Sequence, residues 1–248
     1  MPSRIREFAV LCALLVVLHA GAAGMLWTDG NTVDAPAAAT ADPSADAETL
    51  LSAAANNDET LRMTSDIRLS YLGNDTTVLR ARTAAAPRKG RARFRAPVRR
   101  PAAPYRFDEI YVTPWGRWKR VGDDWSYAGG PDARYEETSP RLFFPAPDAA
   151  DRVETMTHGN GTTTVRLEGA RTAPGPLSAA GENATFTYRI AFDDDRPYVA
   201  HATARPTGAN GLSVTVDRRR GADVRRPDAL PPTTPREIRD RLLAGAGV

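Results

Sequence analysis

Basic residues are concentrated in one stretch of the chain, and they are the groups best placed to bind a ligand. Between Thr76 and Arg106 the sequence has ten lysines or arginines and no aspartate or glutamate. Arginine alternates there with small or apolar residues, and alternate residues of a strand share one face of a sheet. We therefore expect a dense positive stripe on one face. Its candidate residues are Arg80, Arg82, Arg91, Arg93 and Arg95.

Such a stripe suits anionic partners, and two interpretations of it stay open. Guanidinium groups can hold anionic lipid headgroups, an acidic surface polymer or phosphate. A solvated outer face in an arginine-rich protein, partly paired with Asp66 or Asp108, would give the same pattern. The composition favours neither, because Lys89 and Lys119 are the only lysines and this bias is typical of a GC-rich genome.

Aromatic side chains form the second candidate site. Three of the four tryptophans lie between Tyr105 and Tyr127, where a hairpin is predicted. They could line the mouth of a carbohydrate or lipid site, or they could fill the core, as aromatic residues on strands commonly do. The candidate ligand-binding residues are Trp115, Trp118, Trp125 and Tyr188.

No set of residues predicts catalysis. His158 and His201 have no neighbouring nucleophile or ligand set typical of a triad or a zinc site. The only cysteine, Cys12, lies in the hydrophobic N-terminal stretch, which leaves the rest of the chain without disulfides or cysteine ligands. Asp193–Asp195 could bind calcium, but aspartate is also favoured in tight turns. We expect no enzymatic activity, no cofactor and no metal.

Three sequons make this a candidate glycoprotein. They begin at Asn74, Asn160 and Asn183, in or beside predicted turns where a glycan could be accommodated. Sequons also arise by chance, so their occupancy is a hypothesis. An unshifted mass of the exported protein after deglycosylation would remove it.

The N-terminus is predicted to direct the chain to a membrane. Residues Phe8–Trp27 are apolar or small apart from one histidine, and two arginines precede them. A helix of this length spans roughly 30 Å, the thickness of the hydrocarbon core of a bilayer. Residues 1–27 are therefore either a signal peptide cleaved near Ala22, releasing a secreted protein, or a single-pass anchor with the domain outside. Export in either form disfavours nucleic acid as a partner.

The rest of the chain is expected to form one linker and one domain. Residues 28–46 are rich in alanine, proline, aspartate and threonine and predict a flexible linker. The domain, 47–248, should begin with a short helix capped by Asp46. It should end with a helix over 235–244, where Thr234 and Glu237 form a capping box. The predicted buried side of that helix consists of Ile238, Leu242 and Leu243.

Between these helices the chain alternates apolar and polar residues in short runs separated by turns. Met63–Tyr71 and Phe186–Phe192 are the clearest examples, and Pro97 is expected to break the chain after an earlier run. The fold class predicted is α+β, mainly antiparallel β, as a curved half-barrel sheet of about eight to ten strands. A short helix lies near each end, and a β-sandwich is the alternative.

The order of these elements resembles the LolA-like periplasmic lipoprotein-carrier fold, with its LppX/LprG-type and archaeal secreted relatives. The shared features are an exported N-terminus, a short helix leading into Met63–Tyr71, a tryptophan-bearing central hairpin and a final β-meander. The resemblance covers Asp46–Pro227 and implies a half-barrel whose apolar cavity holds acyl chains. It implies a non-enzymatic exported or membrane-tethered protein that carries or senses a lipid or lipid-linked molecule. The alternative is a cell-surface structural or interaction module with a filled core.

Overall fold

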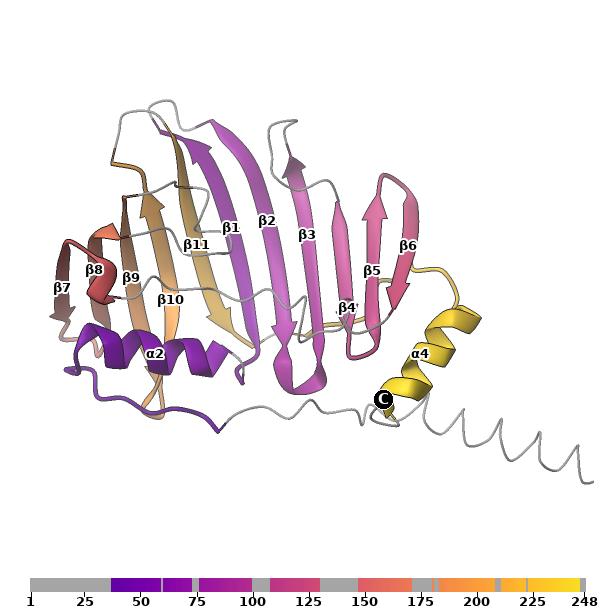
Figure 1. Ribbon diagram of the computed structural model, residues 1–248, viewed down its shortest axis with the longest axis horizontal. Helices are drawn as coiled ribbons and strands as arrows, with labels where there is room; N and C mark the ends of the chain where they lie inside the picture. Colours follow the sequence, from indigo (N-terminus) through magenta and orange to yellow (C-terminus); the bar gives the residue numbers. More distant parts are fainter. Residues whose placement is uncertain are drawn as a thin grey trace, which may run out of the picture.

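The computed structural model describes residues 37–58, 60–72, 76–99, 108–129, 147–170, 180, 183–207, 211–221 and 223–245 (Figure 1). The helices are α2 (Ala47–Asp58) and α4 (Pro235–Gly245), with short 3-10 turns at Pro87–Lys89 and Pro147–Ala149. The strands are β1 (Met63–Tyr71), β2 (Thr77–Ala86), β3 (Arg91–Arg99), β4 (Glu109–Thr113), β5 (Gly116–Val121), β6 (Asp124–Gly129), β7 (Arg152–Thr157), β8 (Thr163–Ala170), β9 (Ala184–Asp193), β10 (Arg196–Arg205) and β11 (Leu212–Arg220).

All of these strands form one open antiparallel sheet in the order β6-β5-β4-β3-β2-β1-β11-β10-β9-β8-β7. The first and last strands meet in its middle, where Met63 is paired with Arg220. The predicted fold class, α+β with a curved sheet, is confirmed, and the described strands do not form a sandwich. The sheet has eleven strands, where about eight to ten were predicted. Even short segments such as β4 and β6 are strands, because each is paired with β5 along its whole length.

The larger core lies between α2 and one face of the sheet at the β7–β11 end (Figure 1). Leu50, Leu51 and Ala54 recur at helical spacing and pack on the strands from this side. Phe186 and Tyr188 fill the sheet beneath them, with their rings stacked 6.4 Å apart. Every one of these side chains is almost fully buried. This half of the sheet is therefore closed by the protein's own side chains.

Both ends of α2 are fixed by polar contacts. At the start, the predicted N-cap is confirmed, because Asp46 accepts a hydrogen bond of 2.8 Å from the backbone N–H of Thr49. At the other end, Asp58 lies 2.7 Å from Arg218 of β11, and the two side chains are only 4% and 5% exposed. This ion pair ties the helix to the middle of the sheet.

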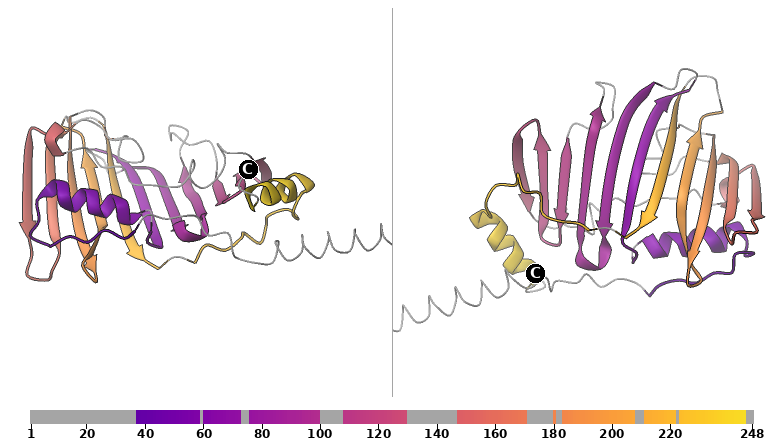
Figure 2. Two further views of the ribbon diagram at one scale, coloured as in Figure 1. Left: turned by 60° about the horizontal axis from the view of Figure 1, so that its bottom comes forward. Right: turned by 180° about the vertical axis from the view of Figure 1, so that it is seen from behind.

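A second core lies on the opposite face, at the β3–β6 end. Ala86, Tyr111 and Trp118 pack there against Val224 and Leu230 of the chain that follows β11. Figure 2 shows that this segment crosses the face of the sheet away from α2. We call residues 223–245, which include α4, the C-terminal arm. The sheet is thus covered on one face at one end and on the other face at the other end.

The predicted buried side of α4 is wrong for Leu242 and Leu243, while Ile238 is half-buried. Leu242 and Leu243 are 38% and 43% exposed, whereas Glu237 and Asp240 are only 2% and 5% exposed. Glu237 is buried with a partner from outside the helix, since it lies 3.1 Å from Arg226, and Asp240 lies 2.8 Å from the neighbouring Arg239. The predicted capping box is confirmed on its N-cap side, since the Glu237 N–H donates a 3.1 Å hydrogen bond to the hydroxyl of Thr234.

Strand β3 continues past Pro97, where a break was predicted. The register between β2 and β3 shifts at this point, from Arg80 opposite Val98 to Arg82 opposite Arg95. Such a shift is a β-bulge, and a bulge tolerates proline because no ladder hydrogen bond from its nitrogen is needed.

Residues 37–46, expected within the flexible linker, lie along the domain. The N–H of Ala41 donates to the carbonyl of Asp195 at 3.0 Å, and the Asn57 side chain donates to the carbonyl of Ala39 at 2.8 Å. The predicted membrane segment Phe8–Trp27 and the sequon at Asn74 lie outside the described residues. Within the described part of the chain, no helix is long and apolar enough to span a bilayer.

Candidate functional site

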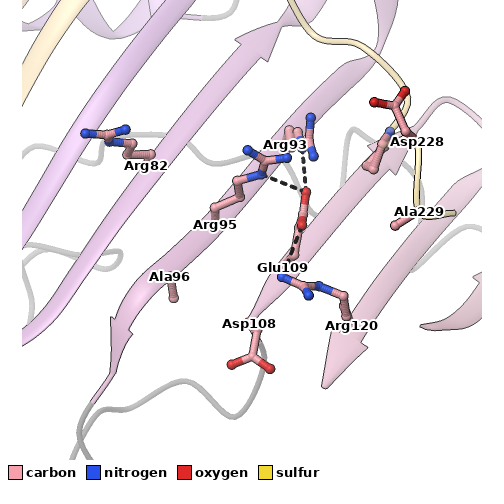
Figure 3. A pocket seen from close by; sticks show the side chains of 10 residues that line it. Arg82, Arg93, Arg95, Ala96, Asp108, Glu109, Arg120, Asp228 and Ala229 are labelled. Carbon is pink, nitrogen blue, oxygen red and sulfur yellow. Dashed lines mark hydrogen bonds and ion pairs between the residues drawn. The ribbon is translucent and has the colours of Figure 1, made fainter. Parts of the chain in front are cut away.

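A pocket of about 530 Å³ lies on the sheet face that carries the C-terminal arm (Figure 3). Strands β2, β3 and β5 supply four arginines to its lining, and residues Pro227–Ala229 of the arm form another part of its wall. We call it the arginine pocket. Its arginines are Arg82, Arg93, Arg95 and Arg120.

The strand register explains why these residues meet. Reading across the sheet from β1 to β5, each residue of one row is paired with the next: Asp66 with Arg82, Arg82 with Arg95, Arg95 with Glu109, and Glu109 with Arg120. Residues directly opposite on neighbouring strands have side chains about 5 Å apart on the same face. The row therefore holds three cations and two anions, with Arg82 and Arg95 side by side and Glu109 between Arg95 and Arg120.

Glu109 lies at the centre of the pocket and is its most buried charged residue, with 5% of its side chain exposed. Its Oε1 accepts from Nε of Arg93 at 2.5 Å and from Nε of Arg95 at 3.0 Å. Its Oε2 lies 3.5 Å from Nη2 of Arg120. A buried carboxylate is stable only when it is paired, and here three guanidinium groups surround it. The cluster thus keeps two positive charges in excess.

The remaining charges lie around this cluster. Arg82 is paired with Asp66 at 3.0 Å on the exposed surface, as the sequence suggested. Asp108 accepts a 2.7 Å hydrogen bond from the N–H of Gly122. Figure 3 shows Asp108 and Asp228 on either side of Glu109, with their carboxylates directed away from it. The lining therefore concentrates positive charge at its middle and negative charge at its margins.

The predicted stripe is largely brought together, but not completely. Arg80 and Arg91 lie on the same sheet face as Arg82. Arg80 is two positions from Arg82 on β2, and Arg91 is paired with Ala86, which is four positions from Arg82. Neither arginine lines the pocket. Glu109 and Arg120 are site residues that the sequence pattern did not predict. The sequence shows the alternation of polar and apolar residues in β4 and β5. It does not show how these strands pair with β3, and this pairing places Glu109 and Arg120 beside the arginines.

The aromatic candidates are divided between the two faces of the sheet. Trp115 and Trp118 are 6% and 2% exposed and lie under the arm, where Arg241 is 4.5 Å from the first ring and Arg226 is 5.9 Å from the second. Tyr188 lies in the other core, and its burial raises the pKa of its hydroxyl well above the usual value. Their role in binding a ligand stays a prediction, and the four do not form one site.

Trp125, the fourth aromatic candidate, lies next to the arginine pocket. Its ring is 5.8 Å from the guanidinium carbon of Arg120, at a distance typical of a cation–π contact. The ring therefore supports one of the four arginines from the side away from Glu109.

The other sequence candidates lie apart from the pocket. His201 contacts Asp217 at 2.7 Å, and His158 contacts Thr164 at 2.9 Å. Over the described ranges, no three histidine, cysteine, aspartate or glutamate side chains are grouped to hold a metal ion. The sequon residues Asn160 and Asn183 are exposed.

Comparisons with known proteins identify no family for this chain by sequence. No family model matches it, and no curated protein matches it. The solved structures with a similar fold include an uncharacterized conserved protein from Thermus thermophilus, at 12% identity and a TM-score of 0.38, covering 73% of this chain and 94% of the other.

Two further structures have comparable values. A LolA superfamily protein from Nitrosomonas europaea is 11% identical with a TM-score of 0.34, covering 76% of this chain and 96% of that one. A DUF1329 family protein from Desulfovibrio piger is 12% identical with a TM-score of 0.32, covering 76% and 97%. The LolA-like resemblance expected from the order of elements thus has a counterpart among solved structures. At these TM-scores the likeness transfers no ligand, activity or site residue.

Proposed function

We propose that this protein is a non-enzymatic binding protein, exported or tethered outside a membrane, that holds a lipid or lipid-linked molecule with an anionic headgroup. The observation that carries the proposal is the arginine pocket, where three guanidinium groups surround one buried carboxylate and a fourth, from Arg82, lies at the edge. Guanidinium groups recognise phosphate and carboxylate by paired hydrogen bonds, which gives an anionic headgroup both affinity and orientation.

The predicted membrane segment supports a lipid surface as the partner. Residues 37–46 are bound to the domain, so an uncleaved anchor would be joined to it only by residues 28–36, which reach about 30 Å at full extension. Such a short connection raises the local concentration of headgroups at the pocket. Each arginine near an anionic leaflet adds roughly 1 kcal/mol of attraction.

The headgroup is the part of the ligand that the described residues can hold. The half of the sheet under α2 is closed by Phe186, Tyr188 and Ile190, each 0% exposed. We therefore place recognition at the arginine pocket and not under α2.

A second function is favoured by that same closed core. If the rest of the sheet is filled in the same way, the protein is a cell-surface interaction module whose outer face binds another macromolecule. It would then retain no lipid, and its partner would be a protein or an acidic polymer.

Native mass spectrometry separates the two functions. The full chain is released from uncharged detergent micelles that contain equal amounts of phosphatidylcholine and phosphatidylglycerol. We expect preferential retention of phosphatidylglycerol, and loss of that preference in Arg95→Gln. The matched control is Arg166→Gln, because Arg166 lies on the same sheet face at the other end and is also paired with glutamates. Equal retention of both lipids, or no retention, would exclude the first function.

A further inference from the structure

We propose that the arginine pocket is a site for a dianionic phosphate group, as in a phosphomonoester or free phosphate. This rests on the proposed function, since it names the chemical group that the same pocket takes. Three observations carry it: the charge around Glu109, the guanidinium atoms that Glu109 uses, and the second wall supplied by the C-terminal arm.

The charge of the cluster fits a dianion. Arg93, Arg95 and Arg120 carry three positive charges, and Glu109 neutralises one of them within hydrogen-bonding or ion-pair distance. A phosphomonoester carries about −1.5 to −2 near pH 7, which matches the charge that remains on these four side chains. Asp108 and Asp228 also line the pocket but lie at its margins, away from the cluster. A carboxylate or a phosphodiester carries a single negative charge and leaves part of the cluster uncompensated. The pocket should therefore distinguish phosphomonoesters from phosphodiesters.

The geometry leaves donors for the ligand. Glu109 accepts from Arg93 and Arg95 through Nε, so these two hydrogen bonds do not use the terminal amino groups of either arginine. Glu109 also fixes the orientation of these two guanidinium groups, because one oxygen atom accepts from both. Preorganised donors cost less side-chain entropy on binding than flexible ones. Arg82, paired only at the surface with Asp66, adds a cation at the edge of the pocket.

The arm makes the site a pocket and not an open face. Pro227, Asp228 and Ala229 line it opposite the strands, and Val224 and Leu230 on either side of them are buried against the sheet. The wall is therefore held in place by apolar contacts that do not involve the ligand. Asp228 is exposed at the margin of the pocket, where its negative charge repels anions that stay at the rim without contacting the arginines.

The test is isothermal titration calorimetry of the full chain in uncharged detergent. Three probes are used: inorganic phosphate, short-chain phosphatidic acid, and short-chain phosphatidylglycerol. We expect phosphate and phosphatidic acid to bind, with phosphatidylglycerol about tenfold weaker because it lacks one charge-assisted contact. Phosphate binding should weaken as the pH falls from about 8 to about 5, because the second pKa of a phosphate ester is near 6.

Two variants locate the site. Arg120→Gln should weaken phosphate binding about tenfold. Arg82→Gln should weaken it about threefold without loss of structure, since Arg82 is 60% exposed and its removal leaves only a surface carboxylate. Arg166→Gln, also an exposed paired arginine on this face, is the control and should bind as the unchanged protein does.

The outcomes separate the inference from the function on which it rests. Equal binding of phosphatidic acid and phosphatidylglycerol would overturn the phosphate inference and leave the proposed function standing. Unchanged phosphate binding in both Arg82→Gln and Arg120→Gln would overturn it as well. If neither lipid binds, the proposed function fails too.

Discussion

The ion pair between Asp58 and Arg218 gives the sharpest test of what holds α2 on the sheet. The two side chains are 2.7 Å apart and 4% and 5% exposed, so replacing Arg218 with methionine leaves a buried carboxylate without its cation. Breaking a buried pair in this way costs about 3–5 kcal/mol. For a domain of this size, 1 kcal/mol corresponds to roughly 2–4 °C in melting temperature. We expect Arg218→Met to lower the melting temperature by about 10 °C.

The assay is thermal unfolding of the full chain in uncharged detergent, followed by circular dichroism. A double variant, Asp58→Asn with Arg218→Met, removes both charges and should recover more than half of the loss, because no uncompensated charge stays buried. Arg166→Met is the matched control: its partner Glu168 is 2.6 Å away, but the pair is exposed and contributes at most about 1 kcal/mol. If Arg218→Met and the control melt at the same temperature, the buried pair does not stabilise the domain.

Three further results are expected. Gly129→Ala should release α4 from the sheet, because an added Cβ would overlap the Asp240 carboxylate. Trypsin should then cleave the C-terminal arm faster, while the circular dichroism signal of the sheet is unchanged. An unchanged rate of cleavage would contradict the contact between α4 and the sheet. Burial holds the pKa of Tyr188 above that of the unfolded chain, so stability that is present below about pH 10 should fall as the pH rises above it. Denaturation midpoints should show a shallower alkaline loss in Tyr188→Phe, and identical slopes would refute this. Replacing Leu242 and Leu243 with glutamine should leave the melting temperature within about 2 °C, since both side chains are exposed; a large drop would mean that they are buried in solution.

Local signals in the sequence predicted local structure well. The period-two alternation located the strands, and the Asp46 and Thr234 caps were recognisable because they depend on residues only three positions away. The pairing of β1 with β11 could not be predicted, because it joins residues as distant as Met63 and Arg220. Alternation also cannot tell which face of each strand an arm from the end of the chain will cover.

The buried side of α4 was mispredicted for the same reason. Hydrophobic spacing made Leu242 and Leu243 the natural core residues, but the partners that permit Glu237 to be buried come from elsewhere in the chain. In the site, the arginine stripe followed from strand alternation alone. Its central carboxylate, Glu109, did not, because its position depends on the register between β3 and β4.

The central position of β1 sets the order in which the sheet can be completed during synthesis. Because a chain is synthesised from its N-terminus, β1 is available early, and its hairpin with β2 can form at once. The other edge of β1 has no partner strand until β11 has been made. The second core is likewise incomplete until Leu230 has been made. Pairings between distant segments form slowly and leave edges exposed meanwhile. The last part of the chain therefore joins the two halves of the sheet, and a protein cut short before β11 would be left with an open, aggregation-prone strand at its centre.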